Sequence, residues 1–143
     1  MCTRMKTLVK GATRFVARAL CSHLLAHGHV VVPTLRRPSG LSDEIVVGDI
    51  GPSSDWAQPL NGCDAVAHLA ARVHVMDDQV DNPTALYRLM NTDATLNIAR
   101  QAAEAGCRVF ALTGGEPLVH REFERLVDGL LDWGDANVAV LTN

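Results

Sequence analysis

The sequence predicts an α/β fold, a doubly wound parallel sheet in a single three-layer domain that spans residues 1–143. Short apolar runs alternate along the chain with longer stretches of helical periodicity, which is typical of repeated βαβ units. The chain has the length of one domain, and 48% of its 143 residues are apolar. Because neither a repeat nor a low-complexity tract divides the sequence, we expect one continuous core.

The first half of the chain carries signals for three strands and two helices. Strands are predicted at 6–10, 29–35 and 45–47, and helices at 14–27 and near Trp56. The apolar face of the first helix is predicted to consist of Phe15, Ala19, Leu20, His23 and Leu24. Gly28 follows that helix and is placed to cap its carboxyl end.

The second half of the chain continues the alternation. Strands are predicted at 65–70, 109–112 and 138–141, a long helix at 84–105, and an amphipathic helix before the last strand. That last helix is expected to bury Phe123, Leu126, Val127, Leu130 and Leu131. These units predict a Rossmann-like sheet of strand order 3-2-1-4-5-6, with a ligand over the carboxyl ends of strands one and four.

Composition excludes several classes of protein. A net charge of −3 argues against nucleic acid as a partner. No apolar run is long enough to span a bilayer, and the amino-terminal residues lack the apolar core of a signal peptide, so we expect a cytoplasmic protein without a membrane partner. The sequence does not identify a protein partner.

Neither the cysteines nor the histidines form a convincing metal site. The four cysteines have no ligand-like spacing, so we expect inert thiols. His23 and His27 stand four residues apart on a predicted helix, but no third ligand accompanies them, so we expect no metal ion. His68 lies in an apolar strand, where we expect a hydrogen-bonded core residue rather than a catalyst.

A glycine turn joins the first strand to the first helix at residues 11–17, the position of a dinucleotide fingerprint. Further motifs follow in order at 48–50 (GDI), 63–71 (CDAVAHLAA) and 91–97 (NTDATLN). Over residues 5–110 the chain resembles the extended short-chain dehydrogenase/reductases, particularly the nucleotide-sugar epimerases, dehydratases and 4-keto reductases. The resemblance implies an NAD(P)-binding domain.

The phosphate-binding loop departs from the pattern of that family, which reads G-x-x-G-x-x-G. Gly11 is the one glycine of the three that remains, and Ala17 replaces the third with a mild change. Arg14 replaces the second, so a long side chain stands where phosphate should approach bare backbone amides. Its charge, and that of Lys10, attracts phosphate but does not restore the space. We therefore expect dinucleotide affinity to be weakened or lost; the alternative is a rearranged loop that still binds.

Other positions acquire roles from the resemblance. Arg36 and Arg37 follow the second strand, where arginine would accept a 2′-phosphate, so they favour NADP over NAD; the alternative is a solvated basic pair. Residues 49–50 would border the adenine, and 69–71 would line the pyrophosphate and the nicotinamide ribose. The residues expected around a cofactor are Gly11, Thr13, Arg14, Phe15, Val16, Arg36, Arg37, Asp49, Ile50, Leu69, Ala70 and Ala71.

The residues that would transfer a proton are missing from the expected places. The family uses a tyrosine with a lysine four residues later. Tyr87 is the single tyrosine, it precedes the fifth predicted strand, and Asn91 stands where the lysine should be. We therefore name no catalytic residue. The substrate-binding part of the family is also expected to be absent.

The segment 109–143 resembles a different family. Leu112-Thr113-Gly114-Gly115-Glu116-Pro117-Leu118, followed by an amphipathic helix and a strand, resembles the GGEP region of radical S-adenosylmethionine enzymes. The alternative is an unrelated glycine turn that begins a helix. The C-x-x-x-C-x-x-C loop that binds the iron–sulfur cluster of that family does not occur, so we expect neither a cluster nor S-adenosylmethionine binding.

The two resemblances meet at a strand, so the chain has the pattern of a chimera. The first hypothesis is a truncated or chimeric NAD(P)-binding-type domain, related to nucleotide-sugar epimerases and reductases but catalytically incompetent. The second is an NAD(P)-dependent epimerase or reductase subunit that needs a partner chain. The third is a non-catalytic protein-interaction module.

Overall fold

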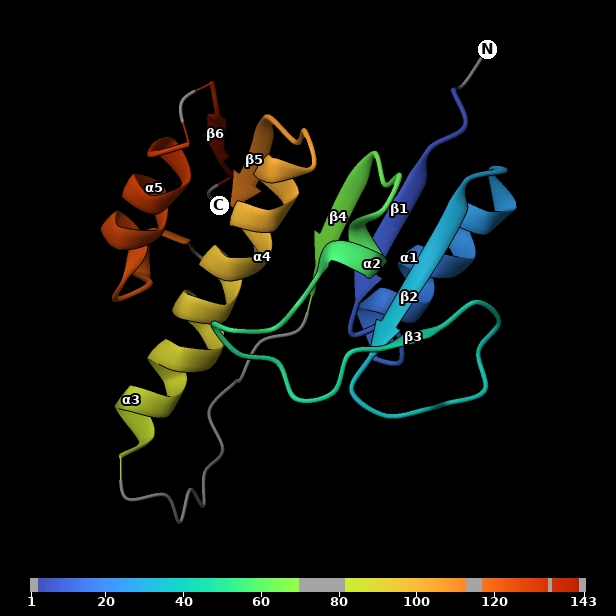
Figure 1. Ribbon diagram of the computed structural model, residues 1–143, viewed down its shortest axis with the longest axis horizontal. Helices are drawn as coiled ribbons and strands as arrows, with labels where there is room; N and C mark the ends of the chain where they lie inside the picture. The colour runs from blue at the N-terminus through green and yellow to red at the C-terminus, as the bar shows by residue number, and fades with distance from the viewer. Residues whose placement is uncertain (1–2, 70–81, 113–116, 134, 142–143) are drawn as a thin grey trace.

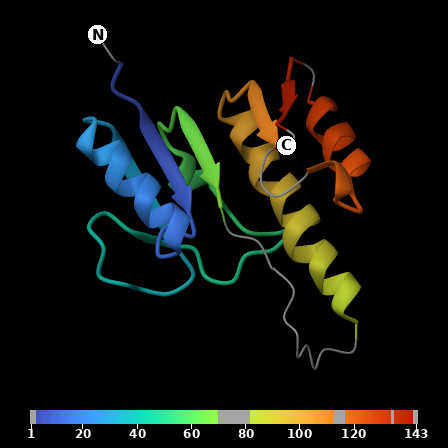
Figure 2. The ribbon, with the colours of Figure 1, turned by 180° about the vertical axis from the view of Figure 1, so that it is seen from behind.

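The computed structural model describes residues 3–69, 82–112, 117–133 and 135–141. Parallel strands with helices on both faces make up the described part, as the predicted α/β class requires (Figures 1 and 2). Among these residues no helix combines the length and the hydropathy that a membrane span needs.

Four parallel strands form the larger sheet, in the order β3-β2-β1-β4. Their bounds are β1 (Lys6–Lys10), β2 (Val30–Leu35), β3 (Ile45–Val46) and β4 (Ala65–His68). The helices on this half are α1 (Phe15–Ala26) and α2 (Ala57–Leu60). These bounds agree with the expected strands to within two residues at each end, and the central pairing of strand one with strands two and four is confirmed.

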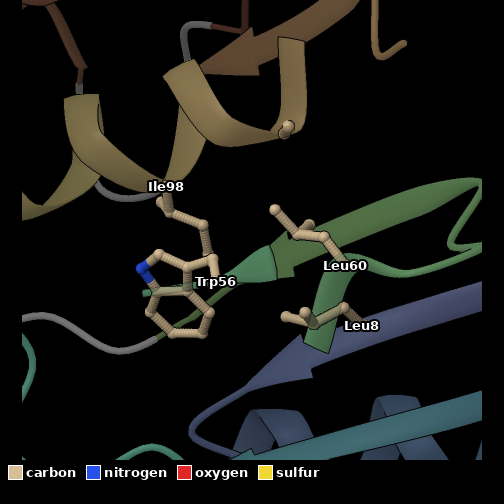
Figure 3. Close-up of a cluster of buried hydrophobic side chains, with 5 residues drawn as sticks. Leu8, Trp56, Leu60 and Ile98 are labelled. Atoms are coloured by element: carbon tan, nitrogen blue, oxygen red, sulfur yellow. The ribbon is translucent and has the colours of Figure 1, made fainter. Parts of the chain in front are cut away.

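The two faces of this sheet bury different clusters, because successive strand residues point to opposite faces. Leu8 packs with Trp56, Leu60 and Ile98 beneath α2 and α4 (Ala94–Glu104) (Figure 3). Its neighbour Val9 packs on the α1 side. Helix α1 accordingly lies behind the sheet in Figure 1 and in front of it in Figure 2.

The predicted apolar face of α1 is wrong by part of a turn. Phe15 is 90% exposed, whereas Ala17 is fully buried. The residues of α1 that contact the core are Ala17, Leu20, Cys21 and Leu24. They follow the i, i+3, i+4, i+7 spacing of one helix face when counting starts at Ala17 rather than at Phe15. Ala19 and His23 are therefore exposed rather than buried. Gly28 has φ +78°, as expected for a residue that ends a helix.

The expected long helix is present, with an irregularity. It consists of α3 (Pro83–Arg88), the π-helical turn η1 (Leu89–Asp93) and α4. The side chain of Asn82 caps the start by accepting a hydrogen bond from the Ala85 amide at 3.0 Å. The extra residue of the π turn shifts the helical phase, so that Asn91 and Thr92 are both buried.

The last unit forms a sheet of its own. Strands β5 (Val109–Leu112) and β6 (Asn137–Val140) pair in parallel, and the 3₁₀ turn η2 (Pro117–Val119) and α5 (Phe123–Leu131) lie between them in sequence. Helix α5 buries Leu126 and Leu130, but Leu131 is 49% exposed, contrary to expectation. Leu131 is the last residue of α5 and follows the buried Leu130 directly, so it lies on a different face of the helix.

The predicted strand order 3-2-1-4-5-6 is confirmed for strands three, two, one and four, but the step from strand four to strand five is wrong. In the part of the chain that the structure describes, β4 pairs with β1 alone, and β5 pairs with β6 alone. A hollow separates β4 from the end of α4, and many of its lining residues are small. They include Ala65, Ala102, Ala105 and Gly106. None of the residues that line this hollow belongs to β5.

Candidate functional site

The loops that follow the strands of the larger sheet meet at its carboxyl edge. The Gly11 amide, just after β1, donates to the Thr34 carbonyl at 3.0 Å. The Val47 amide, just after β3, donates to the Leu35 carbonyl at 2.9 Å. Figure 1 shows these connections at the end of the sheet opposite the amino terminus. Ligands of parallel α/β sheets bind at this edge.

The turn between β1 and α1 has two features that phosphate loops share, a left-handed glycine and a helix that follows it. Gly11 has φ +78°, in the left-handed region that glycine tolerates best. The Arg14 amide donates to the Gly11 carbonyl at 2.9 Å, and Arg14 then stands extended at the N-cap of α1. Its side chain makes no capping hydrogen bond among the described residues. The first amides of α1 therefore face the carboxyl edge with the positive end of the helix dipole.

The side chains on this turn are unusually large for a phosphate loop. Arg14 is exposed at the N-cap, and Phe15 and Val16 are 90% and 62% exposed. Thr13 is exposed as well. Amides at the start of a helix can bind an anion, and the exposed Arg14 stands at the N-cap next to them. Ala17, by contrast, is fully buried against the sheet, so its methyl group is accommodated in the core.

A basic pair stands at the ends of the two central strands. Lys10 of β1 is opposite His68 of β4 in the parallel register. Lys10 is 2% exposed, and this burial lowers its pKa to about 8. Burial also lowers the pKa of His68 to about 3, and the nearby charge of Lys10 adds to the effect. His68 is therefore neutral at pH 7.

The hydrogen bonds of His68 determine its tautomer. The Thr95 hydroxyl donates to the Asn91 carbonyl at 2.8 Å, so its oxygen is left to accept from His68 Nε2, 3.0 Å away. The ring proton therefore lies on Nε2, and Nδ1 presents a lone pair. Nδ1 is inaccessible to solvent and has no hydrogen-bond partner among the described residues. The expected hydrogen bond of His68 is confirmed, while its side chain is half-buried rather than fully buried in the core.

Of the two basic residues after β2, Arg36 pairs with a carboxylate of this chain, whereas the sequence indicates a role in binding a 2′-phosphate. Arg36 Nε forms an ion pair with Asp49 Oδ1 at 2.5 Å, and both side chains are largely exposed. Arg37 is exposed beside them. Ile50 does not face this ion pair; it packs against the cluster around Leu8 and Trp56. The structure thus pairs Arg36 with Asp49, and Arg37 is the next residue along the chain.

Sequence reasoning missed Glu44. Its carboxylate is bound by the Ser39 hydroxyl and by the amides of Ser39, Gly40 and Leu41. These hydrogen bonds, that of the Ser39 hydroxyl first, lower the pKa of Glu44 to about 2. No sequence pattern relates a glutamate to amides three to five residues earlier in a loop, so only the folded loop shows it.

The remaining predicted positions lie partly beyond the described residues. Leu69 follows β4 and is 38% exposed. Ala70 and Ala71 lie outside the described residues, as do Gly114, Gly115 and Glu116 of the second motif. In the described ranges, no three His, Cys, Asp or Glu side chains are grouped so as to hold a metal ion.

The strand order, the glycine turn into α1 and the loops converging on one edge define a Rossmann-like α/β domain. The family model for the NAD-dependent epimerase/dehydratase family matches residues 7–117. The chain belongs to that family.

Individual relatives agree with this assignment. Over 106 residues the chain is 40% identical to a UDP-glucose 4-epimerase of Vibrio cholerae, covering 72% of this chain and 32% of that protein. It is also 30% identical over 142 residues to an uncharacterized protein of Mycobacterium tuberculosis, covering 96% of this chain and 15% of the relative. The chain thus spans a third or less of either protein.

Solved structures share the fold. One is a short-chain dehydrogenase/reductase superfamily protein from Agrobacterium tumefaciens with bound NAD, with a TM-score of 0.70 and 23% identity; the match covers 96% of this chain and 48% of that one. Another is MoeE5 in complex with UDP-glucose and NAD, with a TM-score of 0.68 and 20% identity, covering 94% and 52% of the two chains. The chain spans about half of each structure.

Proposed function

We propose that the chain is an NAD(P)-binding domain of the nucleotide-sugar epimerase and reductase type, with a phosphate loop altered at Arg14. The observation that carries this proposal is the Gly11 turn, which directs the first amides of α1 toward the carboxyl edge of the sheet. The relatives support it, since the Agrobacterium structure holds NAD and the MoeE5 structure holds NAD with UDP-glucose.

We further propose that these 143 residues have no epimerase or reductase turnover by themselves. Proton transfer needs a tyrosine whose pKa is lowered by a nearby lysine. Tyr87 stacks near His120, with ring centroids 5.8 Å apart, and the residue four positions later is the buried Asn91. The second reading, a subunit that borrows a Tyr-x-x-x-Lys pair from a partner chain, predicts turnover of a nucleotide-sugar only when that partner is added.

The origin of the segment 109–143 is a separate proposal. Its βαβ unit forms a sheet apart from the larger one, which supports a chimeric join at β5. The match to the Mycobacterium protein runs over 142 residues and so includes this segment, which supports a single ancestry instead. Calorimetric titration with S-adenosylmethionine tests the chimeric origin. Heat of binding would favour a segment retained from a radical S-adenosylmethionine enzyme.

The third reading, a protein-interaction module, depends on the outer edge of β6. Val140 and Leu141 are 36% and 57% exposed, and within the described residues β6 pairs with β5 only. An exposed strand edge is a template for pairing with another chain. A mass that rises with protein concentration, measured by light scattering, would support this reading.

The proposed cofactor site is tested by calorimetric titration with NADH and NADPH, after circular dichroism has shown that each variant folds. We expect Arg14→Gly to bind at least about tenfold more tightly than the native chain, because glycine removes the side chain beside the amides and still serves as an N-cap. Ala17→Gly should add less, since Ala17 already fits the core.

The matched control is Arg18→Ala, which removes the same charge from α1 one turn later. If Arg14→Gly and Arg18→Ala both bind like the native chain, the steric argument for Arg14 is wrong. If no variant binds either dinucleotide, the proposed function itself is overturned, and the protein-interaction reading is favoured instead.

A further inference from the structure

Two histidines stand against each other at the carboxyl end of α1. His23 and His27 are four residues apart, a spacing that places both side chains on one face of the helix. Their ring centroids are 4.2 Å apart, and the ring planes are inclined by 36°. Both residues are exposed, so the adjacent rings are accessible from solvent.

Hydrogen bonds fix the ring of His27. Its Nδ1 atom lies 2.8 Å from the His23 carbonyl oxygen, and that oxygen also accepts from the His27 amide at 3.2 Å. A carbonyl oxygen can only accept, so Nδ1 carries the ring proton, and Nε2 of the neutral ring presents a lone pair. Histidines that bind metal ions commonly have this arrangement, in which the other ring nitrogen donates to a backbone carbonyl.

The position of the pair on the helix favours a cation. Helix α1 ends at Ala26, so His23 lies in its last turn and His27 is its C-cap residue. This end of a helix carries the negative end of the helix dipole. Imidazole nitrogens suit divalent nickel, copper and zinc, whereas magnesium and calcium take oxygen ligands. The pair therefore fits a divalent transition-metal ion.

We propose that His23 and His27 chelate one divalent transition-metal ion, with water in its remaining coordination positions. The spacing alone indicates no metal ion, because no third protein ligand accompanies the two histidines. The structure adds two observations to the spacing, namely that the rings are adjacent and that the tautomer of His27 leaves Nε2 to a ligand. An ion that binds only the folded helix also stabilises the folded chain.

The proposed metal site is separate from the proposed cofactor site. The amino end of α1 faces the carboxyl edge of the sheet, and the histidine pair stands at the other end of this 12-residue helix. A helix of that length extends about 18 Å. His29, just beyond the pair, accepts a hydrogen bond from the Met5 amide, so this end of α1 lies near the start of β1 (Figure 1). Metal binding at the pair therefore does not depend on dinucleotide binding.

Calorimetric titration with Ni²⁺, in a buffer that does not chelate metals, tests the site. His23→Gln and His27→Gln each remove one ligand nitrogen from an exposed position. His29→Gln is the matched control, because Nδ1 of His29 accepts from the Met5 amide at 3.2 Å and the ring proton therefore lies on Nε2. Neither nitrogen of His29 is then left to bind a metal ion. Circular dichroism first checks that each variant keeps the helix content of the native chain.

We expect Ni²⁺ to bind the native chain and His29→Gln with the same Kd, to within about twofold. Each variant of the pair should bind at least about tenfold more weakly, because a chelate loses most of its affinity with either ligand. If the two rings bound separate ions, each single variant would instead keep one site of native affinity, and chelation would be overturned.

NMR spectra identify the ligands directly. Because Ni²⁺ is paramagnetic, it should broaden the ring signals of His23 and His27 together, at a lower concentration than it broadens those of the other histidines. Broadening that begins at other histidines would overturn the proposal, as would a Kd that neither variant of the pair changes. A loss of affinity in His29→Gln as large as in the pair would show that the ion binds elsewhere.

Discussion

Gly129 of α5 lies directly against Leu96 of α4. A Cβ atom added at Gly129 would stand 2.7 Å from Leu96 Cδ2, closer than real Cβ atoms approach other atoms, and 3.3 Å from Cδ1, which is a tight contact. This contact is where the last unit of the chain is packed onto the long helix. The absence of a side chain at Gly129 therefore determines how near α5 can approach.

We predict that Gly129→Ala destabilises the fold when residue 96 is leucine and stabilises it when residue 96 is alanine. In the native chain the added methyl group should destabilise the fold by about 1 kcal/mol, because overpacking outweighs the better helix propensity of alanine. In a Leu96→Ala background the clash is gone, so Gly129→Ala should stabilise by up to about 1 kcal/mol. Urea unfolding of the four proteins measures this cycle; additive effects would contradict it.

Lys10 should make stability rise with pH in the alkaline range. Its pKa is about 8 in the folded chain, because burial disfavours the charged form, and 10.5 is the ordinary value. Between these values the unfolded chain holds a proton that the folded chain has lost, so raising the pH disfavours unfolding.

We therefore expect the stability of Lys10→Met relative to the native chain to decrease between pH 7 and pH 10, by up to about 3 kcal/mol, because methionine does not titrate. Urea unfolding at pH 7, 8.5 and 10 measures it. Lys6→Met is the control, since Lys6 is the other lysine and its ammonium donates to the Asn61 carbonyl at 2.7 Å. A Lys10→Met difference that does not depend on pH would count against a buried, neutralised amine.

His68 should make the protein sensitive to acid. Burial lowers the pKa of His68 to about 3 from an ordinary value of 6.5. Between these pH values the unfolded chain binds a proton that the folded chain excludes, so stability falls as the pH decreases from 6.5 toward 3. His68→Gln should flatten this slope, because an amide can donate to Thr95 without titrating. The comparison is urea unfolding at pH 4.5 and 7, with the exposed His23→Gln as control.

A charged cluster ties α5 to the long helix. Arg125 pairs with Asp93 at 2.6 Å and with Glu122 at 3.3 Å, and Glu122 also accepts from Arg88 at 2.6 Å. The Arg88 hydrogen bond and, after it, Arg125 hold the pKa of Glu122 below its usual range.

We expect Arg125→Ala to lower the Tm more than Arg121→Ala, which removes a neighbouring exposed arginine. The difference should shrink in high salt, because screening weakens exposed ion pairs. It should also shrink as the pH falls and Glu122 is protonated. Calorimetric scans at low and high salt measure the Tm of both variants. Equal Tm losses would mean that the charged cluster around Arg125 adds no stability.

Local patterns in the sequence were sufficient for much of the fold. The alternation of apolar runs predicts every strand of the larger sheet. The fingerprint predicts a glycine turn between β1 and α1, where Gly11 has a positive φ. Local periodicity did not predict the buried face of the first helix correctly. Phe15 is apolar and in phase with several apolar neighbours, yet it is 90% exposed because the sheet contacts the face that begins at Ala17.

The sequence by itself determined the elements, their parallel order around β1 and the family, because these follow from short-range periodicity and motifs. Only the tertiary structure decided that β5 and β6 form a separate sheet and that Lys10 is buried beside His68. The same holds for Glu44, whose carboxylate accepts hydrogen bonds from three amides of its own loop. Each of these depends on which residues distant in sequence, or which backbone groups of a folded loop, are brought into contact. Those contacts are set by packing and desolvation across the whole domain, so no local pattern encodes them.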